Sequence, residues 1–278
     1  EIASDNQAAI RIGQRFLDEF QKVQALKIPH GFSGKDDSGQ ETPPSLMQKL
    51  LVVRLLDKKR AGNWSGTGSG KTLSAVLASR VIGAKVTLIF CSNNTIDGWR
   101  KKLLAYFPDS DVQSKTFAPE WRTRSRHRYL LLNYEALQQS DSMAQCEQLT
   151  KQAIEFVVLD EAHNVKQREM ESSSKRRHVV RTLLGQLGEK TPGLYLLAMS
   201  ATPLINNLEE ARSLVELVTG KPCDLDTGES HERGRQNAMA LRCKMQPLGI
   251  RYIPHYKPHF EQIEEPVDCA EFLDELRG

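Results

Sequence analysis

Hydrophobic positions near the amino end of the chain recur at helical spacing. Residues 4–27 place Ile10, Phe16, Leu17, Phe20, Val23 and Leu26 on one side of an amphipathic helix, which Ser4 or Asp5 can cap. Residues 29–44 are rich in Gly, Ser, Asp and Pro, so this segment is predicted to be a loop or linker. Ser45 can cap a second helix over 46–58. The chain is therefore predicted to begin with a helical extension.

The middle of the chain alternates between short apolar runs and helical patterns. Strands are predicted at 86–90, 129–132, 156–159 and 194–198, and helices at 73–82, 95–106, 142–153 and 175–187. Such alternation is typical of right-handed crossovers in a mostly parallel sheet with helices on both faces. After residue 203 the pattern predicts helices at 208–219 and 229–245 and short strands at 249–254 and 260–267. The predicted fold class is a three-layer α/β lobe whose chemistry lies at the carboxyl ends of the strands.

Composition places the 278 residues among ordinary globular chains, with 39% hydrophobic and 26% charged residues. No window approaches 18 uncharged apolar residues, so no membrane partner is expected. Five cysteines without a Cys-x-x-Cys pair are typical of reduced thiols, which predicts an intracellular protein, cytoplasmic or in the nucleoid if bacterial.

Positive charge is concentrated in two runs, although the net charge is only +3. The first contains Arg122, Arg124, Arg126, His127 and Arg128, and the second contains Lys175, Arg176, Arg177, His178 and Arg181. Each run is either solvated surface or a contact for nucleic-acid phosphates, and the sequence leaves both readings open.

The segment 65–72, Ser-Gly-Thr-Gly-Ser-Gly-Lys-Thr, has the composition of a nucleotide phosphate loop. Glycines allow a backbone with positive φ and a close approach of its amides to phosphate, and the loop leads into a helix N-terminus that favours an anion. Lys71 would supply charge to the β- and γ-phosphates, and Thr72 a hydroxyl to Mg²⁺. Ser65 stands where the usual pattern begins with Gly. The alternative interpretation is a plain glycine-rich turn.

A buried strand at 156–159 ends in Asp160 and Glu161. Hydrolysis of a nucleoside triphosphate needs a carboxylate that holds Mg²⁺ and a group that activates the attacking water. Asp160 suits the first role and Glu161 the second. Acidic residues also commonly end strands, so the pair gains weight from the phosphate loop upstream.

Together these motifs resemble a known family. The phosphate loop, Asp160-Glu-Ala-His163 and Ser200-Ala-Thr202-Pro203 resemble motifs I, II and III of superfamily-two helicases and translocases with a DEAH box. Residues 88–92 with Trp99, residues 132–137, residues 164–166 and residues 203–210 resemble the Swi/Snf-type branch. The resemblance covers about 42–267. It implies a RecA-like P-loop NTPase lobe over 42–267, an N-terminal helix and linker over 1–41, and an acidic tail over 268–278 that leads to a missing second lobe.

The resemblance also implies roles for individual residues. ATP would be bound by Gln48, which would read adenine, and by Ser65, Gly66, Thr67, Gly68, Ser69, Gly70, Lys71 and Thr72. The catalytic residues would be Lys71, Asp160 and Glu161, and the metal would be bound by Thr72 and Asp160. The nucleotide site would be coupled to the strand-binding face by His163, Ser200 and Thr202. Nucleic acid would be contacted by Ser92, Asn93, Asn133 and Tyr134. Two alternatives stay open: Gln48 as an exposed helix residue, and Trp99 as a core residue instead of a nucleic-acid contact.

The expected function is the ATP-binding half of an ATP-dependent DNA translocase or helicase-like motor, with ATP and Mg²⁺ as cofactors. ATP hydrolysis by this lobe alone is expected to be weak, because the resemblance implies that a second lobe supplies an arginine finger. The nucleic acid is expected to be DNA in preference to RNA. The rival hypotheses are a DEAH-type RNA helicase lobe and a P-loop switch or scaffold that does not translocate.

Overall fold

A computed structural model describes residues 7–32, 34–35, 41–121, 125–138, 141–165, 175–203, 208–224 and 231–254. The predicted strand at 260–267, the acidic tail at 268–278, the predicted caps Ser4 and Asp5, and Arg122 and Arg124 lie outside these residues. The division into 1–41, 42–267 and 268–278 therefore stays a prediction.

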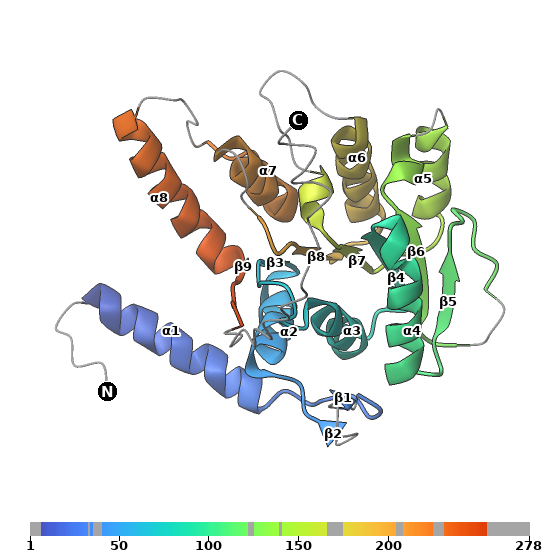
Figure 1. The fold of residues 1–278 in the computed structure, drawn as a ribbon, viewed down its shortest axis with the longest axis horizontal. Helices are drawn as coiled ribbons and strands as arrows, with labels where there is room; N and C mark the ends of the chain where they lie inside the picture. The colour runs from blue at the N-terminus through green and yellow to red at the C-terminus, as the bar shows by residue number, and fades with distance from the viewer. Residues whose placement is uncertain are drawn as a thin grey trace, which may run out of the picture.

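Seven parallel strands form the central sheet of the described chain (Figure 1). In chain order they are β3 (Arg60–Asn63), β4 (Val86–Cys91), β5 (Asp111–Ser114), β6 (Arg128–Asn133), β7 (Phe156–Leu159), β8 (Tyr195–Met199) and β9 (Gly249–Ile250). Their order across the sheet is β5-β6-β4-β7-β8-β3-β9, and all six neighbouring pairs are parallel. The prediction of a mostly parallel α/β sheet is confirmed.

Helices cover both faces of the sheet and give three layers (Figure 1). One face carries α2 (Leu46–Lys58), α3 (Lys71–Ile82) and α4 (Ile96–Tyr106), and the other carries α5 (Ser142–Thr150), α6 (Lys175–Lys190), α7 (Leu208–Thr219) and α8 (His231–Leu248). Strand β4 shows why both layers form: Leu88 and Phe90 enter the core under α5–α8, while Ile89 and Cys91 enter the core under α2–α4. Fully apolar strands need cover on both sides.

The sequence pattern did not predict strands β3 and β5. The residues of β3 are Arg-Ala-Gly-Asn, which give no apolar run, yet this strand pairs with both β8 and β9. A Cβ on Gly62 would lie 2.0 Å from Trp64 Cζ2, so the indole covers the place where a side chain would stand. Strand β5 pairs only with β6 and is an edge strand of mixed polarity. In the predicted loop at 29–44, β1 (Gly34–Lys35) and β2 (Glu41–Thr42) form a small antiparallel pair.

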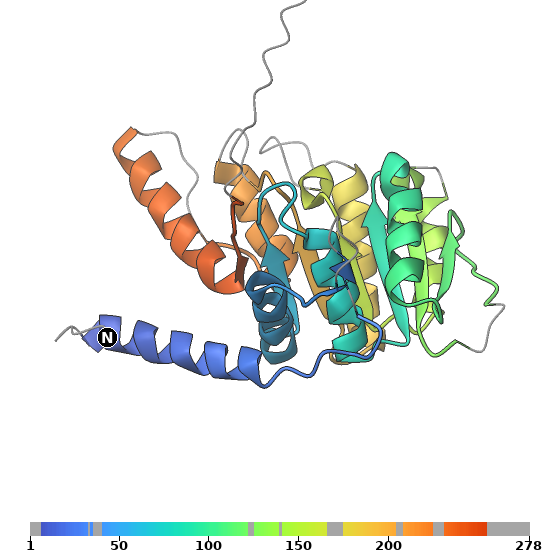
Figure 2. The ribbon, with the colours of Figure 1, turned by 60° about the horizontal axis from the view of Figure 1, so that its bottom comes forward.

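The N-terminal helix is present, but most of its predicted apolar stripe does not pack on the lobe. Helix α1 (Gln7–Gln24) projects from the body (Figure 2). Phe16 and Phe20 on this helix are 60% and 38% exposed. Val23 near its end is buried. Salt bridges from Arg54 to Glu19 and from Lys22 to Asp57 tie the helix to α2. Two ion pairs and the buried Val23, and not a continuous apolar stripe, attach the last part of α1 to the lobe.

The close approach of β9 to β3 predicts a specific sensitivity to side-chain volume. A Cβ on Gly249 would lie 2.3 Å from the Gly62 carbonyl oxygen, so Gly249→Ala is expected to lower the free energy of unfolding by about 1–3 kcal/mol. Urea denaturation followed by far-UV circular dichroism measures this loss.

Gly185→Ala provides the matched control, because a Cβ there meets no heavy atom within 4 Å and the residue lies inside α6. The control is expected to gain about 0.5–1 kcal/mol. Equal stability of the two variants would contradict the packing described for β9.

Candidate nucleotide and metal site

Three loops that carry the predicted site residues leave neighbouring strands at one edge of the sheet. Strands β7, β8 and β3 lie side by side and parallel, so their carboxyl ends meet at the same edge. The acidic pair follows β7, Ser200 follows β8, and the phosphate loop follows β3 soon after its last residue. Main-chain bonds continue past the strands, with Ser200 N donating to Asn63 O at 3.0 Å. The sheet therefore brings together segments that are far apart in sequence.

The phosphate loop has the backbone that its glycines predict. Gly68 and Gly70 have φ of 72° and 82°, and α3 begins directly afterwards at Lys71. A helix N-terminus presents unpaired amides to an anion. Within the described chain, the Ser69 hydroxyl is buried and has no hydrogen-bond partner, which suits a group that meets phosphate oxygens. These features fit a nucleotide.

Lys71 lies over its own loop and interacts electrostatically with the acidic pair. Its Nζ donates to the carbonyls of Ser65 and Gly66, each at 3.0 Å. Burial lowers the pKa of Lys71, while the negative charges of Glu161 and Asp160 act in the opposite direction. The lysine and both carboxylates thus belong to one electrostatic cluster.

Ser65, which replaces the usual first Gly, has a structural role in this fold. The residue is fully buried, and its Oγ accepts a hydrogen bond from Tyr252 N at 3.0 Å. The next amide, Gly66 N, donates to Tyr252 O at 2.8 Å, and Trp64 N donates to Ile250 O at 2.7 Å. The hydroxyl therefore anchors the chain after β9 to the loop, and a role for Ser65 in binding ATP stays a prediction. The sequence gives no signal for this contact across 187 residues.

Gln48 is buried, which excludes the reading of an exposed helix residue. Its Oε1 accepts from Ser45 N at 2.8 Å, and Ser45 Oγ accepts from Gln48 N, so the two residues form the capping box of α2. Its Nε2 donates to Gly70 O at 3.3 Å. Gln48 thus joins α2 to the phosphate loop, and its role in reading adenine stays a prediction.

Asp160 is held from three directions. Trp99 Nε1 donates to Oδ2 at 2.8 Å, Glu161 N donates to Oδ1 at 3.1 Å, and Tyr134 Oη donates to the main-chain carbonyl at 2.7 Å. Burial raises the pKa of Asp160, while the Trp99 hydrogen bond acts to lower it. A buried carboxylate whose ionised form is stabilised by a nearby positive charge is a suitable ligand for a hard cation such as Mg²⁺.

Glu161 adopts a left-handed backbone with φ of 50°, which is unusual for a residue with a side chain. His163 lies in η3 (Ala162–Val165), with Nδ1 3.1 Å from Glu161 Oε2 and 3.2 Å from Ser200 Oγ. The close contact with His163 lowers the pKa of Glu161. The histidine therefore connects the acidic pair to the loop after β8.

The predicted coupling and metal residues occupy this same edge. Thr202 N donates to Ser200 Oγ at 3.2 Å, although the Thr202 side chain is exposed. Thr72 stands in the first turn of α3 and is half-buried. The Thr72 hydroxyl and the Asp160 carboxylate are oxygen groups of the kind that Mg²⁺ prefers, and their role as metal ligands stays a prediction.

The predicted nucleic-acid residues separate into surface and buried positions. Asn93 is exposed at the start of η1 (Asn93–Thr95), and Ser92 and Asn133 are half-buried. Tyr134 is only 1% exposed, and its hydroxyl is bonded to Asp160, so its side chain supports the acidic pair and does not face a nucleic acid. For Trp99, which is 3% exposed, the core reading is the correct one.

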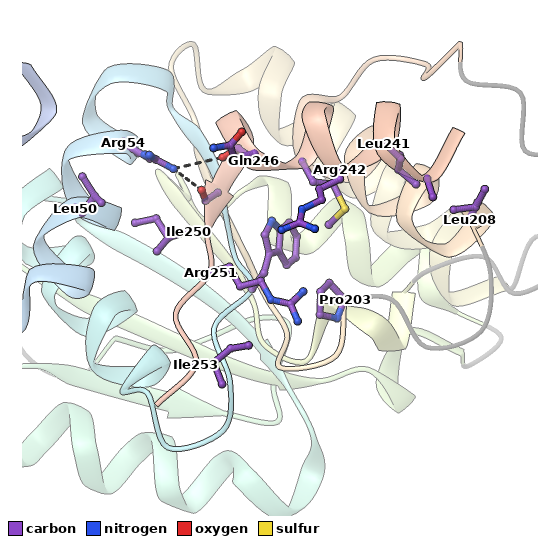
Figure 3. A pocket seen from close by; sticks show the side chains of 14 residues that line it. Leu50, Arg54, Pro203, Leu208, Leu241, Arg242, Gln246, Ile250, Arg251 and Ile253 are labelled. Atoms are coloured by element: carbon purple, nitrogen blue, oxygen red, sulfur yellow. Dashed lines mark hydrogen bonds between the residues drawn. The ribbon is translucent and has the colours of Figure 1, made fainter. Parts of the chain in front are cut away.

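A pocket of about 750 Å³ lies beside the phosphate loop (Figure 3). Trp64, the residue before the loop, and Pro203, the last residue of the third motif, line it together with residues of α2, α8 and β9. Arg242 and Arg251 extend along its rim from α8 and from the residues after β9 (Figure 3). None of the predicted ATP-binding or metal residues lines this pocket, so it is separate from the candidate site.

Comparison with protein families gives a match over residues 18–205 to the family described as type III restriction enzyme, res subunit. The chain belongs to this family. The matched segment contains the phosphate loop, the acidic pair and Ser200, so these residues of the candidate site lie inside the region that matches the family. A comparison with curated protein sequences gives no match.

Among solved structures, the res-subunit chain is similar to the Sulfolobus solfataricus SWI2/SNF2 ATPase core in complex with dsDNA. The TM-score is 0.58 at 16% identity, and the match covers 83% of this chain. The chain spans about half (47%) of that structure's length. The shared fold is RecA-like, and with the family match it makes the chain a helicase-like lobe of superfamily two. No helix in the described ranges is both long and apolar enough to cross a membrane.

Two arginines of the second basic run, Arg176 and Arg177, make contacts within the folded chain. Arg177 Nη2 lies 2.8 Å from Glu216 Oε2, and the two side chains are 4% and 11% exposed. Arg176 places its guanidinium 5.9 Å from the Tyr134 ring centroid and donates to Asn164 O. These two arginines support α6, α7 and η3, which leaves less of the run for phosphates.

The buried pair predicts a stability defect for Arg177→Met. Glu216 would lose its closest partner but keep Arg212 Nε at 3.5 Å from Oε1, so the expected loss is near the lower end of the range for a broken buried pair, about 3 kcal/mol. Urea denaturation measures it. Arg181→Met is the matched control, because Arg181 is 54% exposed and 3.9 Å from the same carboxylate, and it is expected to change stability by less than about 0.5 kcal/mol. Equal losses would contradict the buried role of Arg177.

Proposed function

We propose that this chain is the ATP-binding half of an ATP-dependent, DEAH-type DNA translocase or helicase-like motor. One observation carries the proposal: the phosphate loop with Lys71 follows β3 and the acids Asp160 and Glu161 follow β7, so that both segments leave the same edge of the parallel sheet. Phosphoryl transfer to water needs these groups together, since catalysis depends on positioning and on stabilising charge.

The residues divide the work of hydrolysis between them. The loop amides and Lys71 would bind the phosphates, and Thr72 with Asp160 would hold Mg²⁺, which would supply positive charge beside the reacting phosphate. Glu161 orients and deprotonates the attacking water. Contact with His163 lowers the pKa of Glu161, which favours the ionised carboxylate that this role requires. The contact of His163 with Ser200 links this step to the loop after β8.

DNA is the proposed nucleic acid, in keeping with the dsDNA named for the similar SWI2/SNF2 core. Exposed Asn93 and half-buried Ser92 and Asn133 would contact backbone phosphates, which gives affinity without sequence reading. A second RecA-like lobe would complete the ATP site with an arginine finger. Without it, turnover is expected to be about 10³- to 10⁵-fold slower.

The proposal predicts the effect of removing the loop lysine. Hydrogen bonds to charged groups contribute about 1.5–3 kcal/mol, so Lys71→Ala is expected to weaken binding of a fluorescent ATP analogue about 10- to 150-fold. Fluorescence anisotropy with Mg²⁺ measures the dissociation constant. Lys151→Ala is the control and should bind as the wild type does, because Lys151 is exposed and forms its salt bridge with Glu147, away from the phosphate loop. Equal affinity of the two variants would refute a nucleotide site at this loop.

A second prediction separates binding from chemistry in the full-length protein. Glu161→Gln keeps the size of the side chain but removes the proton acceptor, so ATP hydrolysis is expected to fall about 10²- to 10⁴-fold while analogue affinity stays within about threefold. A coupled phosphate-release assay with duplex DNA present measures the rate. Hydrolysis that survives the substitution would assign the proton acceptor to another residue.

Two rival functions are distinguished by the nucleic acid. A DEAH-type RNA helicase would bind single-stranded RNA in preference to duplex DNA, which competition binding by the full-length protein measures. A P-loop switch or scaffold would bind nucleotide but show no salt-dependent affinity for either polymer.

A further inference from the structure

The indole of Trp99 makes a direct contact with the metal-binding position. Its Nε1 donates to Asp160 Oδ2 at 2.8 Å, and an indole has no other polar donor to offer. Trp99 packs in the same buried cluster as Ile96 and Leu103 of α4. The ring cannot turn away without opening this core, so the position of Oδ2 is set by the position of the helix.

The remaining contacts of Asp160 leave the carboxylate a single orientation. Glu161 N occupies one site on Oδ1, and an ionised carboxylate has about four such sites. One lone-pair direction on each oxygen therefore remains for a cation. The main chain is fixed separately, since Asp160 N donates to Phe90 O and Tyr134 Oη donates to Asp160 O.

We propose that Trp99 is a positioning residue that orients the Mg²⁺ ligand Asp160 and so links magnesium affinity to the placement of α4. The inference rests on the proposed function, because it assigns Asp160 to Mg²⁺. Partners that orient a metal ligand from behind commonly contribute about 10- to 100-fold in metal affinity.

Helix α4 also connects this contact to the predicted nucleic-acid segment. Thr95 N and Thr95 Oγ1 both donate to Ser92 O, at 3.0 and 2.9 Å, which ties the turn η1 to the start of α4. Trp99 lies one helical turn further on. A nucleic acid that moves residues 92–95 would therefore move the donor that holds Oδ2.

A purely structural role for the indole makes a different prediction. In that case the Trp99 N–H would merely be satisfied by the nearest acceptor, and its removal would lower stability without a specific effect on the metal. The distinguishing quantity is the Mg²⁺ concentration at which nucleotide binding is half enhanced.

The test compares Trp99→Phe with the wild type. Phenylalanine keeps an aromatic ring in the core and removes the N–H. Binding of a fluorescent, non-hydrolysable ATP analogue is titrated with MgCl₂, and the half-point is expected to rise about 10- to 100-fold, while affinity in EDTA stays unchanged. Trp121→Phe is the matched control, since Trp121 packs against Arg128 and not against the acidic pair, and its half-point should equal that of the wild type.

The outcomes separate this inference from the proposed function. An unchanged half-point in Trp99→Phe, with Lys71→Ala deficient in binding, overturns the positioning role and leaves the nucleotide site intact. A wild-type protein that binds no analogue refutes the proposed function itself.

A measurement on the wild-type sequence covers the case in which Trp99→Phe does not fold. The indole ¹H–¹⁵N resonance of Trp99, assigned against the spectra of Trp64→Phe and Trp121→Phe, is expected to shift when MgCl₂ is added to the analogue-bound protein. The Trp121 resonance should stay in place. A Trp99 resonance that does not respond to Mg²⁺ overturns the proposal.

Discussion

The parallel register of β7, β8 and β3 is the constraint on which the site depends. Parallel neighbours end at the same edge, and their main-chain bonds continue into the loops, as when Ser200 N donates to Asn63 O and Asp160 N to Phe90 O. Each loop therefore starts from a fixed position. The acidic pair and the phosphate loop meet because the sheet aligns them, although about ninety residues of chain separate them.

The sequence predicted the strands that carry their own hydrophobic signal. Strands β4, β6, β7 and β8 are apolar on both faces, and the alternation with helices specified a parallel sheet. Strand β3 has no such signal because Trp64 covers Gly62 from outside the strand. For helix α1 the helix itself was predicted and its packing was not. Helical spacing predicted the helix, but periodicity does not say whether Phe16 packs against the lobe, and Phe16 remains exposed.

At the site, the residue types were enough to predict the chemistry, but they were not enough to predict which residues contact one another. Lys71, Asp160 and Glu161 belong to chemical classes that phosphate and magnesium require, so they could be proposed from spacing alone. The contacts of Ser65 with Tyr252 and of Trp99 with Asp160 join residues 187 and 61 positions apart, and only the folded sheet brings them together. The assignment of Tyr134 to a family motif stays a prediction, and burial gives its side chain a supporting role.

The anchoring of residues 250–252 beside the phosphate loop has a mechanical consequence. Trp64 N, Gly66 N and Ser65 Oγ all bond to this short segment, which runs parallel to the loop's first residues. A force along the strand direction loads these three hydrogen bonds together in shear. They must therefore break together and not one after another. Tension applied to the chain at Tyr252 is therefore transmitted to the backbone of the phosphate loop before the segment detaches from the sheet.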